Sequence, residues 1–249
     1  MINLKSEEEI KKMRSAGKIL AKTLQYLKEI AKPGITTKEL DIEAEKIIRK
    51  ANMLPGFKGY NGYPATICAS INEEVVHTIP SNRKLQEGDI LTIDTGVICD
   101  GYNTDAAITF PIGQVSKEIN KFIETVKKAL FKGIEQVKPG NKIGDISFAI
   151  QKLVESEGYS IIKKLTGHGV GRKLHEEPTV YNYGKAHKGP SLKPGMTIAI
   201  EPIIAMGSGE IKTLSDKWNI VTKDGRLAAQ YEHTILVTPN GYEILTQID

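Results

Sequence analysis

The sequence predicts an α+β fold made of two similar halves, about residues 1–112 and 113–249. Each half begins with two amphipathic helical patterns and continues into apolar strand patterns that carry acidic residues. Lys-Pro-Gly at residues 32–34 returns 106 positions later, and Asp94 and Glu201 are separated by 107 positions. We interpret this repeat as a duplication within a single domain, with acidic residues on opposite walls of a central cleft. The alternative is chance, because Lys-Pro-Gly is a common way to end a helix.

Two capping boxes mark the helices of the first half. Ser6 and Glu9 begin a long amphipathic helix, and Thr36 and Glu39 begin a second helix after the first Lys-Pro-Gly. In the second half, apolar residues at steps of three and four predict a helix from about residue 117 to the second Lys-Pro-Gly, and another helix after it. The order of helix, stop and helix is therefore the same in both halves.

A β-hairpin is predicted around Asp100-Gly101, between two apolar segments. If those two residues form the turn, Asp94 lies opposite Ala107 and Asp105 lies opposite Gly96. The two aspartates then share one face of the hairpin, and both carboxylates can reach one point between them. The alternative is a pair of solvated aspartates, since Asp is common near turns.

The second half carries the other candidate residues. Glu201 ends an apolar strand predicted at residues 196–200, and Glu232 lies in a strand predicted at residues 229–237. His168 stands in the segment GHGVG, where glycines allow the backbone to approach other groups closely. A buried carboxylate in a strand must be paired, protonated or bound to a metal ion, and no basic residue adjoins these carboxylates.

Four carboxylates in one cleft would repel each other and raise their own pKa values. Two divalent cations would cancel that charge, and oxygen ligands with one imidazole favour Mn, Fe, Co, Ni or Zn over a thiolate zinc site. Such a dinuclear site indicates hydrolysis, because paired cations activate water and polarise a carbonyl group. The candidate metal ligands are Asp94, Asp105, His168, Glu201 and Glu232.

The composition excludes several other classes of protein. Hydrophobic residues make up 40% and charged residues 26% of the 249 residues, which is typical of a globular chain rather than a disordered or collagen-like one. Two cysteines cannot form a disulfide scaffold, so we expect a reducing compartment, the cytoplasm. Without an apolar leader or a long apolar run, secretion and membrane insertion are not expected. The net charge of +4 is modest, and no specific nucleic-acid binding is predicted.

The motifs around these residues resemble the dinuclear metallopeptidases of the pita-bread fold and, within that fold, the type I methionine aminopeptidase family. The resemblance spans nearly the whole chain and rests first on TID, NTD, GHGVG, IEP and QYEHT, which contain the candidate ligands in order. Further matches are GYP at 62–64, CASINE at 68–73, HEEP at 175–178 and KPGMT at 193–197. The implied fold has two pseudo-symmetric halves in which antiparallel β-sheet is flanked by helices.

The resemblance also implies roles for the candidate ligands. Asp94 would hold one metal ion, Asp105 and Glu232 would bridge both ions, and His168 and Glu201 would complete the second site. Glu201 is also the implied proton carrier. The implied reaction is hydrolytic removal of the initiator methionine from nascent polypeptides, with a preference for a small second residue. The implied enzyme is a monomer that associates transiently with the ribosome.

Further residues match the part of the family pattern that contacts substrate. His77 and His175 correspond to two histidines that are not ligands, and they are implied to contact the substrate amide and stabilise the tetrahedral intermediate. A thioether suits soft, aromatic walls. The pocket for the methionine side chain is implied at Tyr60, Tyr63, Cys68 and Trp218.

Three positions depart from the family pattern. Ala106 stands where a threonine hydroxyl usually lies near the metals, so the surroundings of the ligands are expected to differ. Leu174 stands where an aromatic residue is common, and Thr78 stands where glycine is common. With neither a cysteine-rich amino-terminal extension nor a long late insertion, the chain resembles the short bacterial type.

Two other functions fit parts of the same pattern. An Xaa-Pro aminopeptidase or prolidase shares the fold and the metal ligands, but such enzymes usually carry a large amino-terminal domain. A non-catalytic pita-bread protein that binds RNA or partner proteins would be favoured if ligands were lost, and all five ligands are present. Cleavage of a Met-Ala-Ser peptide or of an Xaa-Pro peptide, with and without a chelator, separates these functions.

Overall fold

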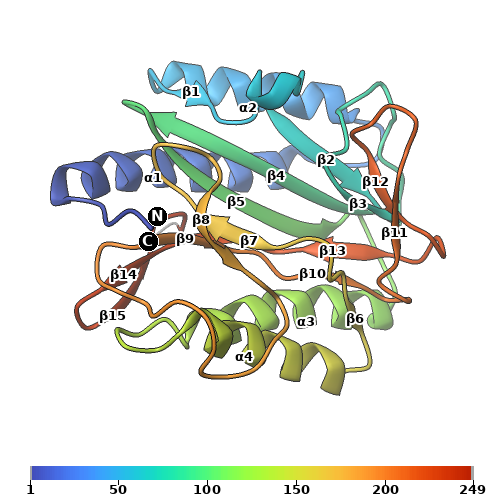
Figure 1. Cartoon of the computed structure of the whole chain (residues 1–249). Coiled ribbons are helices and arrows are strands. Elements are labelled where there is room, and N and C mark those ends of the chain that lie inside the picture. Colours follow the sequence, from blue (N-terminus) through green and yellow to red (C-terminus); the bar gives the residue numbers. More distant parts are fainter. Residues whose placement is uncertain (1, 248–249) are drawn as a thin grey trace.

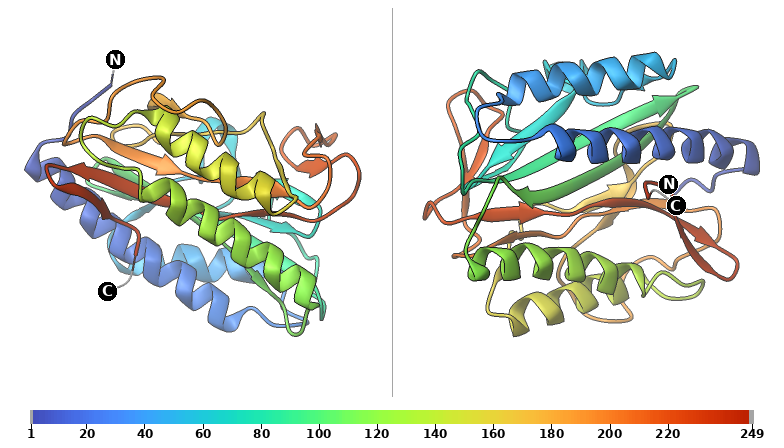
Figure 2. Two further views of the ribbon diagram at one scale, coloured as in Figure 1. Left: turned by 90° about the horizontal axis from the view of Figure 1, so that it is seen from below. Right: turned by 180° about the vertical axis from the view of Figure 1, so that it is seen from behind.

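The computed structural model describes residues 2–247, and its helices form two pairs. The helices α1 (Glu7–Ile30) and α2 (Thr37–Lys50) lie along strands of the first half, while α3 (Lys117–Ile134) and α4 (Ile143–Ser156) lie along strands of the second half (Figure 1). Seen from behind in Figure 2, both pairs lie over the strands. No helix in the described residues is long and apolar enough to cross a bilayer.

Two larger antiparallel sheets and two smaller ones carry the strands. In the first half, β4 (Ile90–Cys99) pairs with β1 (Leu54–Pro55), β2 (Ile67–Ile71) and β5 (Tyr102–Pro111). In the second half the order is β15 (Gly241–Ile244), β14 (His233–Thr238), β9 (Thr197–Ile200), β7 (Gly167–Gly169) and β8 (Glu176–Val180). The smaller sheets consist of β13 (Ala228–Gln230), β10 (Ile203–Ala205) and β6 (Ser160–Ile161), and of β11 (Ile211–Thr213), β12 (Ile220–Thr222) and β3 (Glu74–Val76).

The predicted helix starts are confirmed. The Ser6 backbone N–H donates to Glu9 at 2.8 Å, and the Thr36 backbone N–H donates to Glu39 at 2.7 Å, as capping boxes require. The predicted end of the first helix in the second half is wrong by several residues. α3 ends at Ile134, because the Val137 N–H donates to the Ile134 carbonyl at 2.9 Å and turns the chain before Lys-Pro-Gly.

The predicted hairpin register is also confirmed. Asp94 pairs with Ala107 and Gly96 pairs with Asp105 across β4 and β5. The turn at Asp100-Gly101 has φ values of 47° and 82°, the left-handed pair that a two-residue hairpin needs. Both aspartates are buried, so the alternative of a solvated pair is excluded.

The 106-residue repeat corresponds to repeated hydrogen bonds. The Gly34 N–H donates to the Leu85 carbonyl at 2.8 Å, and the Gly140 N–H donates to the Leu192 carbonyl at 3.1 Å. Both glycines have left-handed φ angles, 96° and 91°. These equivalent contacts support our proposal that one domain contains two related halves, about residues 1–112 and 113–249.

The strand predicted at residues 229–237 is wrong as a single element. Its first part, β13, pairs with β10, while its second part, β14, pairs with β9. The chain changes sheets between them, at Tyr231 and Glu232. Glu232 instead forms an isolated bridge with Ala107 of β5, in which the Glu232 N–H donates to the Ala107 carbonyl at 2.9 Å.

Separate apolar clusters stabilise the two halves. The first packs α1 and α2 on β2, β4 and β5, with Leu20, Leu40 and Leu91 among its fully buried residues. The second packs α3 and α4 on the second-half strands, with Phe122 and Ile198 fully buried. The strand faces that point away from these clusters meet at the centre of the molecule, where the acidic residues lie.

Candidate metal centre

The first and second halves are joined directly beside Asp105. The Asp105 N–H donates to the Thr234 hydroxyl at 2.9 Å, and that hydroxyl donates to the Asp105 carbonyl at 2.8 Å. Two residues further along β5, the bridge between Ala107 and Glu232 continues the contact. Because side chains alternate along a strand, this junction places the Asp105 and Glu232 carboxylates on the same side.

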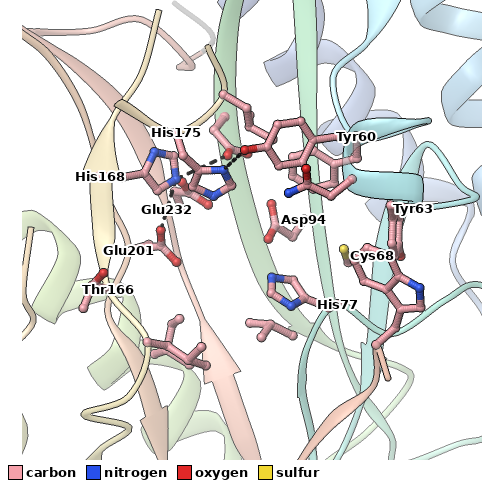
Figure 3. A pocket seen from close by; sticks show the side chains of 18 of the residues that line it. Tyr60, Tyr63, Cys68, His77, Asp94, Thr166, His168, His175, Glu201 and Glu232 are labelled. Atoms are coloured by element: carbon pink, nitrogen blue, oxygen red, sulfur yellow. Dashed lines mark hydrogen bonds and ion pairs between the residues drawn. The ribbon is translucent and has the colours of Figure 1, made fainter. Parts of the chain in front are cut away.

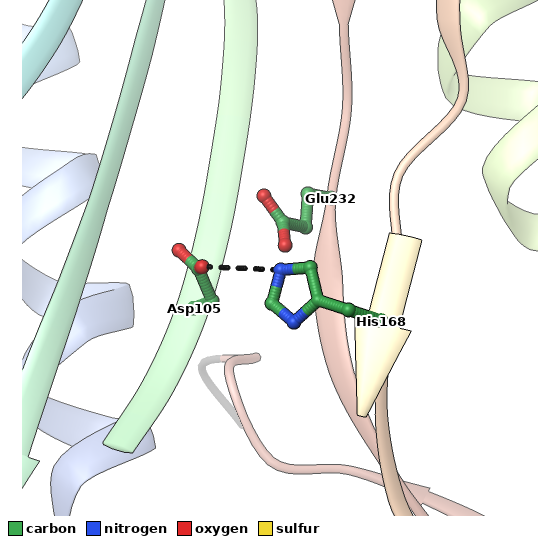
Figure 4. A group of neighbouring side chains, drawn as sticks. All are labelled: Asp105, His168 and Glu232. Atoms are coloured by element: carbon green, nitrogen blue, oxygen red, sulfur yellow. Dashed lines mark ion pairs between the residues drawn. The ribbon is translucent and has the colours of Figure 1, made fainter. Parts of the chain in front are cut away.

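β7 brings the imidazole of His168 to these carboxylates. His168 pairs with Ala199 of β9, and Ala199 precedes Glu201 by two residues. His168 Nε2 lies 3.7 Å from an Asp105 oxygen and 3.5 Å from a Glu201 oxygen. Ligand atoms of Asp105, His168 and Glu232 all lie within 4.8 Å of one another. Figure 4 shows these three side chains pointing toward one another. Residues from four separate strand regions therefore converge on one small volume.

The protonation of His168 fits a metal ligand. Its Nδ1 lies 2.9 Å from the Gly169 carbonyl, which can only accept, so Nδ1 carries the proton and Nε2 presents a lone pair. Burial, helped by the nearby His175, lowers the pKa of His168 to about 4, so the ring is neutral at pH 7. His168 Nε2 lies 3.5 Å or more from the oxygens of Asp105 and Glu201, and it has no proton to donate to them. A cation between the nitrogen and these oxygens would bind the lone pairs of both.

Three of the carboxylates each have an oxygen without a hydrogen-bond partner. One oxygen of each of Asp94, Asp105 and Glu232 is buried without a hydrogen bond. Within residues 2–247, no lysine or arginine forms an ion pair with a carboxylate of the cluster. Buried charge without a partner is costly, whereas divalent cations bind such oxygens strongly. The residues present therefore fit a divalent metal site.

Gln230 is part of this centre and was not singled out from the sequence, although it lies in the QYEHT motif. Its side-chain Nε2 lies 3.3 Å from Glu201, 3.3 Å from Glu232 and 3.5 Å from Asp94. A neutral amide donates weak hydrogen bonds to three carboxylates here. Gln230 orients these carboxylates, but because it is neutral it does not balance their negative charge.

The electrostatics of the cluster follow from burial and proximity. Burial raises the pKa of Asp94 to about 7. Burial and the neighbouring carboxylates raise the pKa values of Asp105 and Glu232 well above their ordinary range, and burial with the Asp94 charge does the same for Glu201. Without cations the folded protein therefore holds protons on these groups at neutral pH.

These pKa shifts predict a pH-dependent stability for the metal-free protein. Below about pH 6.5 the buried histidines bind protons when the chain unfolds, so their effect on the pH dependence of the free energy of unfolding is opposite to that of the carboxylates. Between about pH 6.5 and 8, the carboxylates dominate, because they are ionised when unfolded but protonated when folded. Each carboxylate that keeps its proton should lower the free energy of unfolding by about 1.4 kcal/mol per pH unit.

Urea unfolding across that pH range, in EDTA and in excess Mn²⁺, measures this dependence. Stability should fall with pH in EDTA and become nearly independent of pH with the metal ion. A free energy of unfolding that is flat or rising in EDTA would contradict the raised pKa values.

A cavity of about 350 Å³ opens over the cluster (Figure 3). All eleven residues singled out from the sequence line it, from both halves of the chain. The cavity also has lining residues that the sequence did not suggest, because their separate positions carry no local motif: Phe57, Asn61, Val76, Lys164, Leu165, Thr166 and Ile203.

One wall of the cavity is apolar and aromatic. Tyr63 and Trp218 pack edge to face, with ring centroids 5.1 Å apart. Tyr63 and Cys68 belong to one apolar cluster with Phe57 and Leu174, and Trp218 packs against it. The Tyr63 hydroxyl donates to the Ile67 and Thr78 carbonyls, at 2.9 and 3.1 Å, which fixes the ring. This wall provides a preformed site for an unbranched, polarisable apolar side chain.

The two histidines that are not expected ligands lie on either side of the cluster (Figure 3). The ring of His175 lies 4.2 Å from that of His168, and its Nδ1 is 2.8 Å from the Tyr60 hydroxyl. His77 has a φ of 59°, a conformation that is unfavourable for a residue with a Cβ and that holds its ring toward the cavity. Burial lowers the pKa values of His77 and His175. Both rings are therefore neutral donors at pH 7.

The side chain of Ala106, one of the departures from the family pattern, points away from the metal centre. Ala106 is fully buried in the apolar cluster under α1 and α2, on the face of β5 opposite to Asp105. The expectation that this position alters the surroundings of the metal ligands is therefore wrong for this chain. Leu174 is part of the apolar wall, and the Thr78 hydroxyl accepts a hydrogen bond from Ser70 at 3.1 Å.

The fold and this carboxylate–imidazole centre define a metal-dependent hydrolase of the pita-bread class. A sequence profile of the family described as "Metallopeptidase family M24" matches residues 11–239. The chain belongs to metallopeptidase family M24, whose members use divalent metal ions.

Relatives with known names match over the full length. The methionine aminopeptidase of Clostridium acetobutylicum is 51% identical over 247 residues, which cover 99% of each chain. The crystal structure of methionine aminopeptidase from Thermotoga maritima superimposes with a TM-score of 0.98 at 42% identity and covers both chains completely. The prolidase of Pyrococcus horikoshii has a TM-score of 0.81 at 25% identity, and the match covers 99% of this chain but 64% of the prolidase.

Proposed function

We propose that this chain is a methionine aminopeptidase that removes the initiator methionine from nascent polypeptides in the cytoplasm. The observation that carries the proposal is that one cavity contains both a carboxylate–imidazole cluster without a basic partner and an apolar, aromatic wall. The cluster suits hydrolysis of an amide, and the wall, which includes the Cys68 thiol, suits a thioether side chain. The full-length match to methionine aminopeptidases supports this assignment.

Two divalent ions would be held by Asp94, Asp105, His168, Glu201 and Glu232. When bound, such ions supply Lewis-acid polarisation of the substrate carbonyl and lower the pKa of water. Their number and identity (Co, Mn, Fe, Ni or Zn) are part of the proposal. Two ions would balance the four carboxylates, which leaves the cavity near neutrality and able to accept an uncharged amine.

Glu201 is the proposed proton carrier. Its carboxylate lies between His168 and Gln230, at 3.5 and 3.3 Å, and faces the cavity. Asn182 donates to the Glu201 backbone carbonyl at 2.9 Å, which fixes the position of the residue. From there Glu201 would accept a proton from the attacking water and deliver it to the leaving amine.

His175 and His77 are the proposed hydrogen-bond donors to the substrate. When the Tyr60 hydroxyl donates to Nδ1 of His175, the remaining ring proton is on Nε2 and faces the cavity. A neutral imidazole in this position can donate to the oxygen that becomes negative during attack. His77, on the opposite side, would contact the substrate amide.

A peptide assay with metal control tests this function. Met-Ala-Ser should lose its methionine when Mn²⁺ or Co²⁺ is supplied, and EDTA should remove the activity. An Ala-Pro peptide of equal length is the control and should be cleaved at least about 100-fold more slowly, because alanine lacks the thioether side chain that the apolar wall would hold. Preferential cleavage of Ala-Pro would favour a prolidase, and cleavage of neither peptide would favour a binding protein.

Sequence identity favours an aminopeptidase over a prolidase. The chain is 51% identical to the methionine aminopeptidase of Clostridium acetobutylicum and 25% identical to the prolidase of Pyrococcus horikoshii. We further propose a monomer that associates transiently with the ribosome and prefers substrates with a small second residue. Size-exclusion chromatography, co-sedimentation with ribosomes and peptides that vary at the second position test these three points.

A further inference from the structure

The segment before α1 forms a buried ion pair on the outer side of the metal centre. Lys5 Nζ lies 2.7 Å from a Glu176 oxygen, and the two side chains are 4% and 6% exposed. The Lys5 backbone N–H donates to the Gly195 carbonyl at 2.8 Å, which fixes this segment against the turn before β9. Burial alone would raise the pKa of Glu176, but the hydrogen bonds from Lys5 and from the Lys173 N–H hold it below its ordinary value.

The partner of Lys5 adjoins a residue of the proposed active site. Glu176 follows His175 directly and is the first residue of β8. Its second carboxylate oxygen accepts the Lys173 N–H at 3.0 Å, so one carboxylate spans the turn formed by residues 173–176. Leu174 and His175, between these anchor points, both line the cavity.

The Lys5 side chain also lies directly under the preceding residues of the loop. A Cβ added at Gly171 would lie 2.3 Å from Lys5 Cε, so the backbone contacts the lysine stem. On the inner side, the His175 ring packs on the rings of His168 and Tyr60 and is hydrogen-bonded to the Tyr60 hydroxyl. The ion pair is therefore the outer support of the turn whose inner side carries His175.

We propose that Lys5 is a positioning residue that holds His175 in place through Glu176. This inference rests on the proposed function, because it gives His175 a role in the reaction. Lys5 does not line the cavity and contacts no residue of the metal cluster. Its effect would be on the orientation of the imidazole, and small displacements of a reacting group can cost on the order of 100-fold in rate.

The test compares Lys5→Met with Lys5→Arg and Arg14→Met in the full chain loaded with Mn²⁺. Lys5→Met should lower kcat on Met-Ala-Ser on the order of 100-fold with KM within about threefold, while Lys5→Arg restores most of the rate. Arg14 is the matched control, because it forms an exposed ion pair with Glu243, at 39% and 36% exposure, and its loss should change kcat by less than about twofold.

A second readout is independent of activity. In metal-free protein labelled with ¹⁵N-histidine, the ring resonances of His175 should shift in Lys5→Met and return in Lys5→Arg, while those of His233 stay unchanged. A wild type that cleaves no methionine peptide would refute the proposed function but leave this measurement valid. Unchanged His175 resonances would refute the positioning role itself.

A double variant addresses the case in which Lys5→Met fails to fold. Lys5→Met with Glu176→Met replaces both charges with apolar groups, so no unpaired charge is buried. The turn still loses the hydrogen bond between Glu176 and the Lys173 N–H, and kcat should remain on the order of 100-fold lower. Wild-type kcat in the double variant would overturn the proposal.

Discussion

Asp105→Asn should lower kcat/KM for Met-Ala-Ser on the order of 1000-fold, corresponding to about 4 kcal/mol of lost transition-state stabilisation. Asp105 lies within 4.8 Å of both His168 and Glu232, so it is central to the proposed dinuclear site. Asparagine keeps the shape of the side chain but loses the negative charge that would bridge two cations. The Thr234 hydrogen bonds involve the Asp105 backbone and remain.

Metal content and stability separate this effect from unfolding. The metal bound after dialysis should fall below the two ions per chain expected for the parent protein. The metal-free variant should be at least as stable as the parent, because a buried carboxylate has been removed. Asp100→Asn, at the tip of the same hairpin, is the matched control, since asparagine tolerates its φ of 47°. Full turnover by Asp105→Asn would rule out a bridging role.

Glu201→Gln should lower kcat between about 100- and 10,000-fold, because the variant cannot accept and return a proton. Glutamine has nearly the same volume and can keep the contact with Gln230, so KM should change much less than kcat. The exposed ion pair of Glu210 and Lys223 offers a matched control in Glu210→Gln, which should leave kcat unchanged. Steady-state kinetics in saturating Mn²⁺ measure both parameters.

A retained rate would assign the proton transfer elsewhere. If Glu201→Gln keeps kcat within about threefold of the parent protein, Glu201 is a ligand or structural residue only. If kcat falls but recovers fully with excess metal ion, the loss reflects weaker metal binding rather than proton transfer. The proposed role requires a low kcat at saturating metal ion.

Local patterns in the sequence were sufficient for much of the fold. Ser6, Thr36 and their glutamate partners mark helix starts because capping depends on residues only three positions apart. The register of Asp94 and Asp105 follows from a two-residue turn, since each paired position is then determined. Where the outcome depended on distant residues, as in the division of residues 229–237 between two sheets, the local pattern was misleading.

The candidate site also contains residues that local patterns predict and residues that only the tertiary structure reveals. The eleven site residues named from the sequence all line one cavity. Gln230 carries no charge, and Phe57 lies outside any motif, so neither had a local signal of its role. Ala106 appeared important by its place next to Asp105, but strand alternation points its side chain into the core.

The sequence by itself determined which side chains are available for chemistry: four acidic residues and one histidine in apolar or glycine-rich surroundings, a composition that is costly to bury without cations. Only the tertiary structure decided that they meet, because their convergence depends on the contact of β5 with Glu232 and Thr234 and on the pairing of β7 with β9. Hydrogen bonds between segments more than 100 residues apart depend on the packing of both halves, which no local pattern encodes.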